Sequence, residues 1–133
     1  MKFYIAHIQG DIMPKVMVTD DSLFMRNKLS KLLAEHGYEI VQAENGVQAV
    51  RVYHKDKPDV VLMDITMPRK NGLEALSDIL KLDPRAQVIM LTALDQKSVA
   101  ATAIMFGAKD FLAKPVSPEL LIKALEKVLR SSA

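Results

Sequence analysis

Two unbroken apolar runs constrain the fold of this chain more than any other feature of its sequence. They lie within DVVLMD (residues 59–64) and QVIMLTA (87–93), and neither alternates with polar residues. Short continuous apolar runs are typical of strands that are covered on both faces. Such strands belong to parallel sheets that have helices packed on each side. The chain is therefore predicted to be an α/β protein.

The rest of the chain alternates between short β-rich segments and segments with helical periodicity. The expected strands are residues 16–19, 38–43, 59–64, 87–93 and 109–115. The expected helices run from Ser22 to Gly37, through 47–53, over 73–82, over 95–106 and over 117–130, the last with Ser117 as its N-cap. Five successive βα units predict a (βα)5 fold, a doubly wound five-stranded parallel sheet with right-handed crossovers.

The composition is that of one globular domain. The chain has 133 residues, of which 50% are hydrophobic and 26% are charged. It has no cysteine, which excludes disulfides and fits a reducing cytoplasm. The formal net charge is +2 with both signs mixed, and no apolar run approaches the length of a membrane span. We therefore expect a cytoplasmic monomer that binds neither nucleic acid nor membranes directly.

The first residues of the chain precede a second methionine, Met13, in the segment MPKVMV. The opening segment lacks the small-residue cleavage site of a secretory signal. We interpret residues 1–12 as a leader or an extension derived from expression, and residues 13–133 as the folded domain. The alternative is that residues 1–12 form a genuine additional strand or arm.

Polar side chains stand at the carboxyl ends of four predicted strands. Asp20 and Asp21 follow the first strand in VMVTDD, Asp64 closes the third, Thr92 the fourth and Lys114 the fifth. In open α/β sheets, ligands bind outside the carboxyl ends of the strands. Neighbouring strands lie about 5 Å apart. If the first and third strands are neighbours, three carboxylates converge on one site.

Crowded carboxylates need a proton or a cation. Two unit charges 4 Å apart repel by about 4 kcal/mol at an effective dielectric constant of 20. Oxygen donors without a nearby histidine or cysteine favour Mg²⁺. Asp20 and Asp21 are then half of a magnesium site, and Asp64 is free to attack a phosphoryl group. The metal, Lys114 and Thr92 would each hold one phosphoryl oxygen and share its charge.

At these residues the sequence resembles the receiver domain of two-component response regulators, in particular the single-domain CheY type. The matching motifs are VMVTDDS, VLMDITMPRKNGLEAL, VIMLTA and GAKDFLAKP, and they cover about residues 15–130. The resemblance implies a receiver domain over residues 13–133 with the flavodoxin-like strand order 2-1-3-4-5. It further implies that the chain is not an enzyme, but a phosphoacceptor that assists its own phosphorylation and dephosphorylation.

The resemblance also assigns roles around the metal. It implies that Asp64 is the phosphoacceptor and that Mg²⁺ is the cofactor. Asp21 would bind the metal directly, Asp20 through water, and Thr66 through its backbone carbonyl oxygen. Lys114 would hold the phosphoryl group.

Three more residues have roles by resemblance. Thr92 would be the hydroxyl switch and Phe111 the aromatic switch, and the bond from Lys114 to Pro115 is expected to be cis. The phosphoryl donor would be a phosphohistidine on a sensor histidine kinase or a phosphotransfer protein. A downstream protein would bind the face formed by the fourth helix (95–106), the fifth strand (109–115) and the fifth helix (117–130).

Each site residue also has an ordinary structural interpretation. Asp20 can cap the first helix, Asp64 can be a turn residue, Thr92 a plain strand residue and Lys114 a solvated lysine. Phe111 can be a simple core aromatic, because an aromatic residue on an edge strand more often belongs to the core. These interpretations compete with the functional ones until the side chains are placed.

Three other functions remain as alternatives. A metal-dependent phosphohydrolase with an aspartyl nucleophile would need a second acid two residues after Asp64, where this chain has Thr66. A pseudo-receiver would bind partners without ever being phosphorylated, although all five site residues are present. A mononucleotide-binding protein of flavodoxin type would need a phosphate-binding loop after the first strand, which the sequence lacks.

Overall fold

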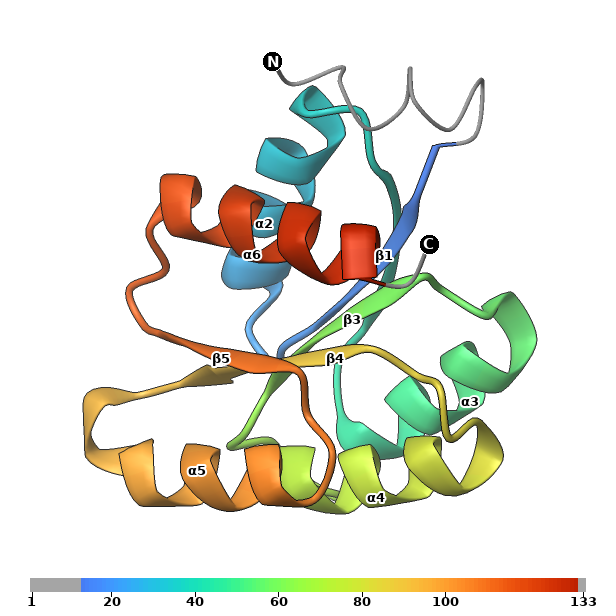
Figure 1. The fold of residues 1–133 in the computed structure, drawn as a ribbon, viewed down its shortest axis with the longest axis vertical. Coiled ribbons are helices and arrows are strands. Elements are labelled where there is room, and N and C mark those ends of the chain that lie inside the picture. The colour runs from blue at the N-terminus through green and yellow to red at the C-terminus, as the bar shows by residue number, and fades with distance from the viewer. Residues whose placement is uncertain (1–12, 132–133) are drawn as a thin grey trace.

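The computed structural model describes residues 13–131, apart from the Leu94 side chain, so the predicted leader, residues 1–12, lies outside the described residues. The sheet has five parallel strands in the order β2-β1-β3-β4-β5 (Figure 1). This order confirms the predicted (βα)5 architecture. It also makes β1 and β3 neighbours, as convergence of the carboxylates requires.

The predicted elements are present with small shifts at their ends. The strands are β1 (Lys15–Thr19), β2 (Glu39–Ala43), β3 (Val60–Asp64), β4 (Val88–Thr92) and β5 (Asp110–Ala113). The helices are α2 (Leu23–Glu35), α3 (Gly46–Asp56), α4 (Gly72–Leu82), α5 (Lys97–Met105) and α6 (Pro118–Ser131), with a 3-10 turn, η1 (Leu94–Gln96), before α5. The segment predicted as the fourth helix is thus a short 3-10 turn followed by an α-helix.

Successive residues of the central strands pack into two different cores, one on each face of the sheet. Leu62 and Ile89 belong to the core beneath α2 and α6. Met63 and Met90 belong to the core beneath α3, α4 and α5. Figure 1 shows these two groups of helices on opposite sides of the sheet. This arrangement explains why the β3 and β4 sequences are apolar without alternation.

Side chains cap the helices that begin next to the carboxyl end of the sheet. Ser22 caps α2, Asn45 caps α3, and Asn71 forms a reciprocal capping box with Glu74 at the start of α4. These caps satisfy backbone N–H groups that have no partner within the helix. They fix where each strand-to-helix loop ends, and these loops carry the candidate site.

The inward face of α2 is not uniformly apolar. Leu29 and Leu33 are buried, whereas Met25 and Leu32 are only partly buried. Arg26 is buried on the same face, which the apolar pattern did not predict. Among residues 13–131, no helix is both long and apolar enough to cross a membrane.

Candidate functional site

Three carboxylates meet at the carboxyl end of β1 and β3. Asp20, Asp21 and Asp64 each offer an oxygen atom, and these atoms lie within 4.8 Å of one another. Asp20 and Asp64 are buried, and Asp21 is exposed to solvent. The predicted convergence of the three acids is therefore confirmed.

Lys114 forms ion pairs with two of the three acids. Its Nζ atom lies 2.9 Å from Oδ2 of Asp20 and 3.2 Å from Oδ2 of Asp64. Burial lowers the pKa of Lys114, but the hydrogen bond to Asp20 and the charge of Asp64 outweigh it and leave this pKa above its usual value. The side chain is therefore not an ordinary solvated lysine, and it carries a positive charge into the cluster.

The environment of Asp64 disfavours its charged form. Burial raises the pKa of the Asp64 carboxyl, and the nearby charge of Asp20 raises it further. The charge of Lys114 and the backbone N–H of Thr66 act in the opposite direction, yet the net pKa remains above the usual aspartate value. A single lysine thus compensates the three acids only in part, and a divalent cation would complete the compensation.

The donor atoms fit a small, hard divalent cation. Magnesium binds oxygen ligands at about 2.0–2.1 Å, so ligands on opposite sides of the ion lie about 4 Å apart. The three carboxylates offer only oxygen atoms, and these lie within 4.8 Å of one another, so side-chain rotation can bring them to one ion. Asp21 is open to solvent, which leaves room for the water ligands that magnesium retains. The residues present therefore point to divalent metal binding.

The loop after β3 is held close to Asp64 by a glycine. The backbone N–H of Gly72 donates to the carbonyl oxygen of Ile65 at 2.7 Å. A Cβ atom at residue 72 would lie only 2.3 Å from the carbonyl oxygen of Asp64. Only a residue without a side chain allows this approach. Thr66, the predicted backbone ligand, lies in this loop and is exposed.

Thr92 lies at the end of β4 and is completely buried. Its hydroxyl group donates to the carbonyl oxygen of Ala93 at 3.0 Å. In this arrangement the hydroxyl is committed to a backbone acceptor. A switch role would require this hydrogen bond to break, so the role of Thr92 stays a prediction.

Two further predictions concern β5 and the loop that follows it. Phe111 is 38% exposed, so its interpretation as a simple core aromatic is wrong. The physical reason is that β5 is an edge strand whose residues alternate between partly buried and exposed. The Lys114–Pro115 bond is cis, as expected.

Arg26 is a site-supporting residue that sequence reasoning missed. Its Nη1 atom donates to the backbone carbonyl oxygen of Asp20 at 2.7 Å, within the buried interior. The side chain of Asp20 also accepts from the backbone N–H of Ser22 at 2.9 Å, so Asp20 supports the start of α2 as well as the cluster. The available signal was a charged residue three positions before Leu29 on an apolar helix face.

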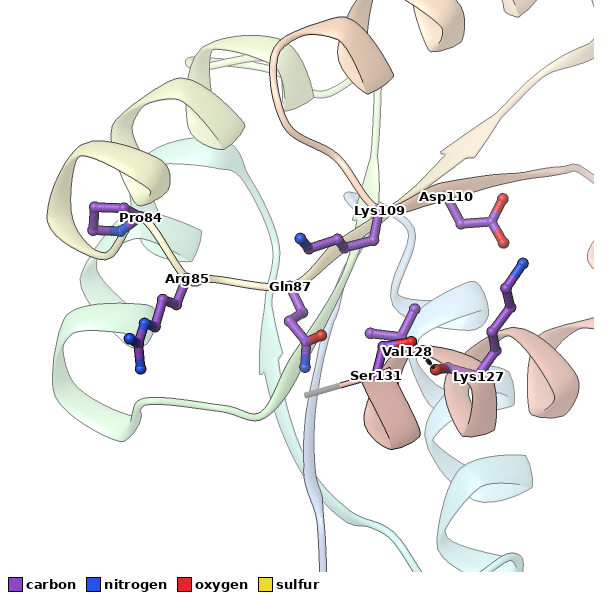
Figure 2. A pocket seen from close by; sticks show the side chains of 8 residues that line it. All are labelled: Pro84, Arg85, Gln87, Lys109, Asp110, Lys127, Val128 and Ser131. Atoms are coloured by element: carbon purple, nitrogen blue, oxygen red, sulfur yellow. Dashed lines mark hydrogen bonds between the residues drawn. The ribbon is translucent and has the colours of Figure 1, made fainter. Parts of the chain in front are cut away.

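A hollow of about 520 Å³ lies at the opposite end of the strands. Figure 2 shows that it is lined by charged side chains, among them Arg85, Lys109 and Lys127, around the start of β4 and β5. None of the clustered acids lines it. This hollow is therefore not part of the candidate site.

Comparison with known proteins agrees with the geometry. The family model for the response regulator receiver domain matches residues 16–126. The chemotaxis protein CheY of Thermotoga maritima is 44% identical over 115 residues, which are 86% of this chain and 96% of that protein. CheY of Listeria monocytogenes is 44% identical over 119 residues, covering 89% of this chain and 100% of that protein.

A solved structure shares the fold. The CheX-CheY-BeF3-Mg complex from Borrelia burgdorferi contains a chain with a TM-score of 0.85 and 32% identity, and the match covers 91% of this chain and 92% of that one. The strand order, the acid cluster and these matches lead to one assignment. This chain belongs to the response regulator receiver domain family and takes part in two-component signalling.

Proposed function

We propose that this receiver domain accepts a phosphoryl group from a phosphohistidine onto Asp64, with Mg²⁺ as cofactor, and then binds a downstream protein. Two-component signalling implies a kinase or phosphotransfer protein as donor and a protein as output partner. The observation that carries the proposal is the cluster of Asp20, Asp21 and Asp64, in which Asp20 and Asp64 pair with the Lys114 ammonium group. The position two residues after Asp64, where the phosphohydrolase alternative needs its general acid, is occupied by Thr66, which disfavours that alternative.

The proposed reaction is a phosphoryl transfer between two protein side chains. A carboxylate oxygen of Asp64 attacks phosphorus, and a P–O bond forms as the P–N bond to the donor imidazole breaks. The electron pair of that bond stays with the imidazole nitrogen. Lys114, already 3.2 Å from Asp64, neutralises charge on the transferred oxygens.

Four residues would hold the metal. The proposed ligands are the carboxylates of Asp21 and Asp64 and the backbone carbonyl oxygen of Thr66, with Asp20 acting through water. When bound, Mg²⁺ supplies positive charge to the phosphoryl oxygens, which is the usual contribution of a divalent cation to phosphoryl transfer. The domain thereby assists its own phosphorylation and dephosphorylation without acting as an enzyme on other molecules.

The signal would pass through Thr92 and Phe111. Phosphorylation adds about −1.5 to −2 charges and three strong acceptor oxygens next to Asp64. Thr92 can then exchange its bond to Ala93 for a bond to the phosphoryl group, and Phe111 can turn inward. The face formed by α5, β5 and α6 would change shape and bind the output protein. We place this cycle in the cytoplasm, in a monomer that does not contact nucleic acid or membranes directly.

The test is stoichiometric labelling by phosphoryl donors. The wild-type chain is incubated with Mg²⁺ and either acetyl phosphate or a radiolabelled sensor kinase, and bound phosphate is measured per chain. We expect up to one phosphate per wild-type chain and loss of labelling by more than about 100-fold in Asp64→Asn, because a carboxamide is a poor nucleophile.

Asp110→Asn is the matched control, because Asp110 lines the distant hollow. It should label like the wild type. Full labelling of Asp64→Asn would refute the acceptor assignment. Steady release of phosphate from a small ester, far beyond one per chain, would instead favour the phosphohydrolase.

A further inference from the structure

The side-chain amide of Gln96 joins two loops at the rim of the candidate site. Its Oε1 atom accepts from the backbone N–H of Ala93 at 3.2 Å. Its Nε2 atom donates to the hydroxyl oxygen of Thr66, which lies 30 residues earlier in the loop after β3. Gln96 ends the 3-10 turn η1, so one side chain connects the loop after β4 to the loop after β3.

Both ends of this connection lead to residues of the proposed reaction. On one side, Thr66 lies two residues after Asp64, in the loop that follows β3. On the other side, the carbonyl oxygen of Ala93 accepts from the Thr92 hydroxyl. Gln96 therefore links the loop that follows Asp64 to Ala93, whose carbonyl oxygen accepts from the predicted hydroxyl switch, Thr92.

The peptide groups of Ala93 are held on both sides in this arrangement. Its N–H is bonded to Gln96 and its carbonyl oxygen to Thr92. If Thr92 turns its hydroxyl toward a phosphoryl oxygen, the bond to the Ala93 carbonyl is lost. Any accompanying shift of Ala93 also strains or breaks its bond to Gln96.

We propose that Gln96 is a positioning residue that stabilises the unphosphorylated arrangement of the loop after β4. It acts through Ala93 and Thr66 and does not touch the reacting atoms. This inference rests on the proposed function, because it sets how readily the site responds to a phosphoryl group. A ligand must supply the free energy difference between the two arrangements. Removing the Gln96 bonds lowers that difference.

The test measures the apparent affinity for beryllofluoride, a phosphoryl mimic, with excess Mg²⁺. Gln96→Met keeps the length of the side chain and removes both polar atoms. One hydrogen bond of this kind changes an equilibrium by about twofold to tenfold. We expect Gln96→Met to lower the half-saturating beryllofluoride concentration by about that factor, read from NMR shifts of the Ala93 and Thr92 amides. The affinity for Mg²⁺ alone should not change.

Gln48→Met is the matched control. Gln48 also accepts a backbone N–H with its Oε1 atom, from Glu44, but it lies on α3 and has no bond to Thr66 or Ala93. It should leave the beryllofluoride affinity unchanged. Damage to the structure of the site would weaken binding, so the predicted tightening separates a positioning role from a purely structural one.

Thr66→Val removes the same connection from its other end, while it preserves the backbone of residue 66. It should tighten beryllofluoride binding as well, and the double variant should gain less than the sum of the two single effects. Unchanged or weaker binding by Gln96→Met, with normal wild-type binding, would overturn the inference alone. Failure of the wild type itself to bind beryllofluoride would overturn the proposed function and this inference together.

Discussion

The two ends of the sheet carry the same kinds of charged side chain in opposite environments. At the carboxyl end, the side chains of Asp20 and Asp64 are 1% and 8% exposed, and Lys114 lies between them. At the amino end, Arg85, Lys109 and Lys127 surround an open hollow and are exposed (Figure 2). Exposed charges interact weakly because water screens them. Burial, rather than the number of charges, is therefore what distinguishes the two ends.

A pair of aspartates shows the same contrast. Burial raises the pKa of Asp64 at the carboxyl end. At the amino end, the pKa of Asp83 is lowered, chiefly by a hydrogen bond from the Tyr53 hydroxyl. The charged form of Asp83 is stabilised by folding, whereas that of Asp64 is opposed by it. The fold thus destabilises the ionised carboxylate of Asp64 at one end and stabilises that of Asp83 at the other.

Magnesium should stabilise the carboxyl end by the largest amount. A ligand present at 100 times its dissociation constant adds about 2.7 kcal/mol to the free energy of unfolding. We expect thermal denaturation to shift upward by an equivalent amount when Mg²⁺ is added, and the shift to vanish in Asp21→Asn. Asp110→Asn, at the amino end, should retain it. An equal magnesium shift in both variants would place the metal away from the acid cluster.

The two aspartates should show opposite pH dependence. Asp64 has a raised pKa in the folded state, so its contribution to stability is complete below pH 3.8 and is lost as the pH rises through the folded-state value. In metal-free buffer, Asp64→Asn should therefore gain stability relative to wild type as the pH rises from 3.8 toward neutrality.

Asp83 has a lowered pKa, so its contribution is present above pH 3.8 and is lost as the pH falls through the folded-state value. The stability deficit of Asp83→Asn should disappear in acid. Urea denaturation at several pH values measures both differences. For each variant, the difference in free energy of unfolding from wild type is followed with pH. If both differences changed in the same direction, the contrast between the ends would be contradicted.

The hydrogen bond at the amino end should affect stability but not the site. The Tyr53 hydroxyl donates to Oδ2 of Asp83 at 2.7 Å and joins α3 to the end of α4. Tyr53→Phe should lower the free energy of unfolding by about 1.5 kcal/mol, the lower end of the range for a hydrogen bond to a charged group, because Asp83 is partly exposed. Beryllofluoride binding should stay unchanged. A changed affinity would mean that the two ends are coupled.

At the carboxyl end, replacing Thr19 is expected to raise the free energy of unfolding by a smaller amount. Thr19 is completely buried on β1, and among the described residues its hydroxyl has no hydrogen-bond partner. A buried polar group without a partner is costly, and valine has nearly the same shape. Thr19→Val should raise the free energy of unfolding by about 1 kcal/mol or less in urea denaturation. A loss of stability would show that the hydroxyl has a partner in solution.

The sequence predicted a structural feature best where a single physical rule determines that feature. Unbroken apolar runs predicted buried parallel strands, and polar residues at the strand ends predicted the site that contains Asp20, Asp64 and Lys114. The exposure of Phe111 could not be read in the same way, because it depends on which side of an edge strand the helices cover. The contacts of Arg26 and Gln96 join residues that are distant in sequence or placed by loops, and no local pattern encodes them.

The close approach of residue 72 to the end of β3 has a consequence for protein engineering. Any side chain there would push against the main chain of Asp64 itself, at a distance of 2.3 Å for the first added carbon. A saturation library at this position should return glycine alone when it is selected for signalling, although Gly72 contributes no chemistry. Because its side chain is a single hydrogen atom, the loop can pack directly against the main chain of Asp64.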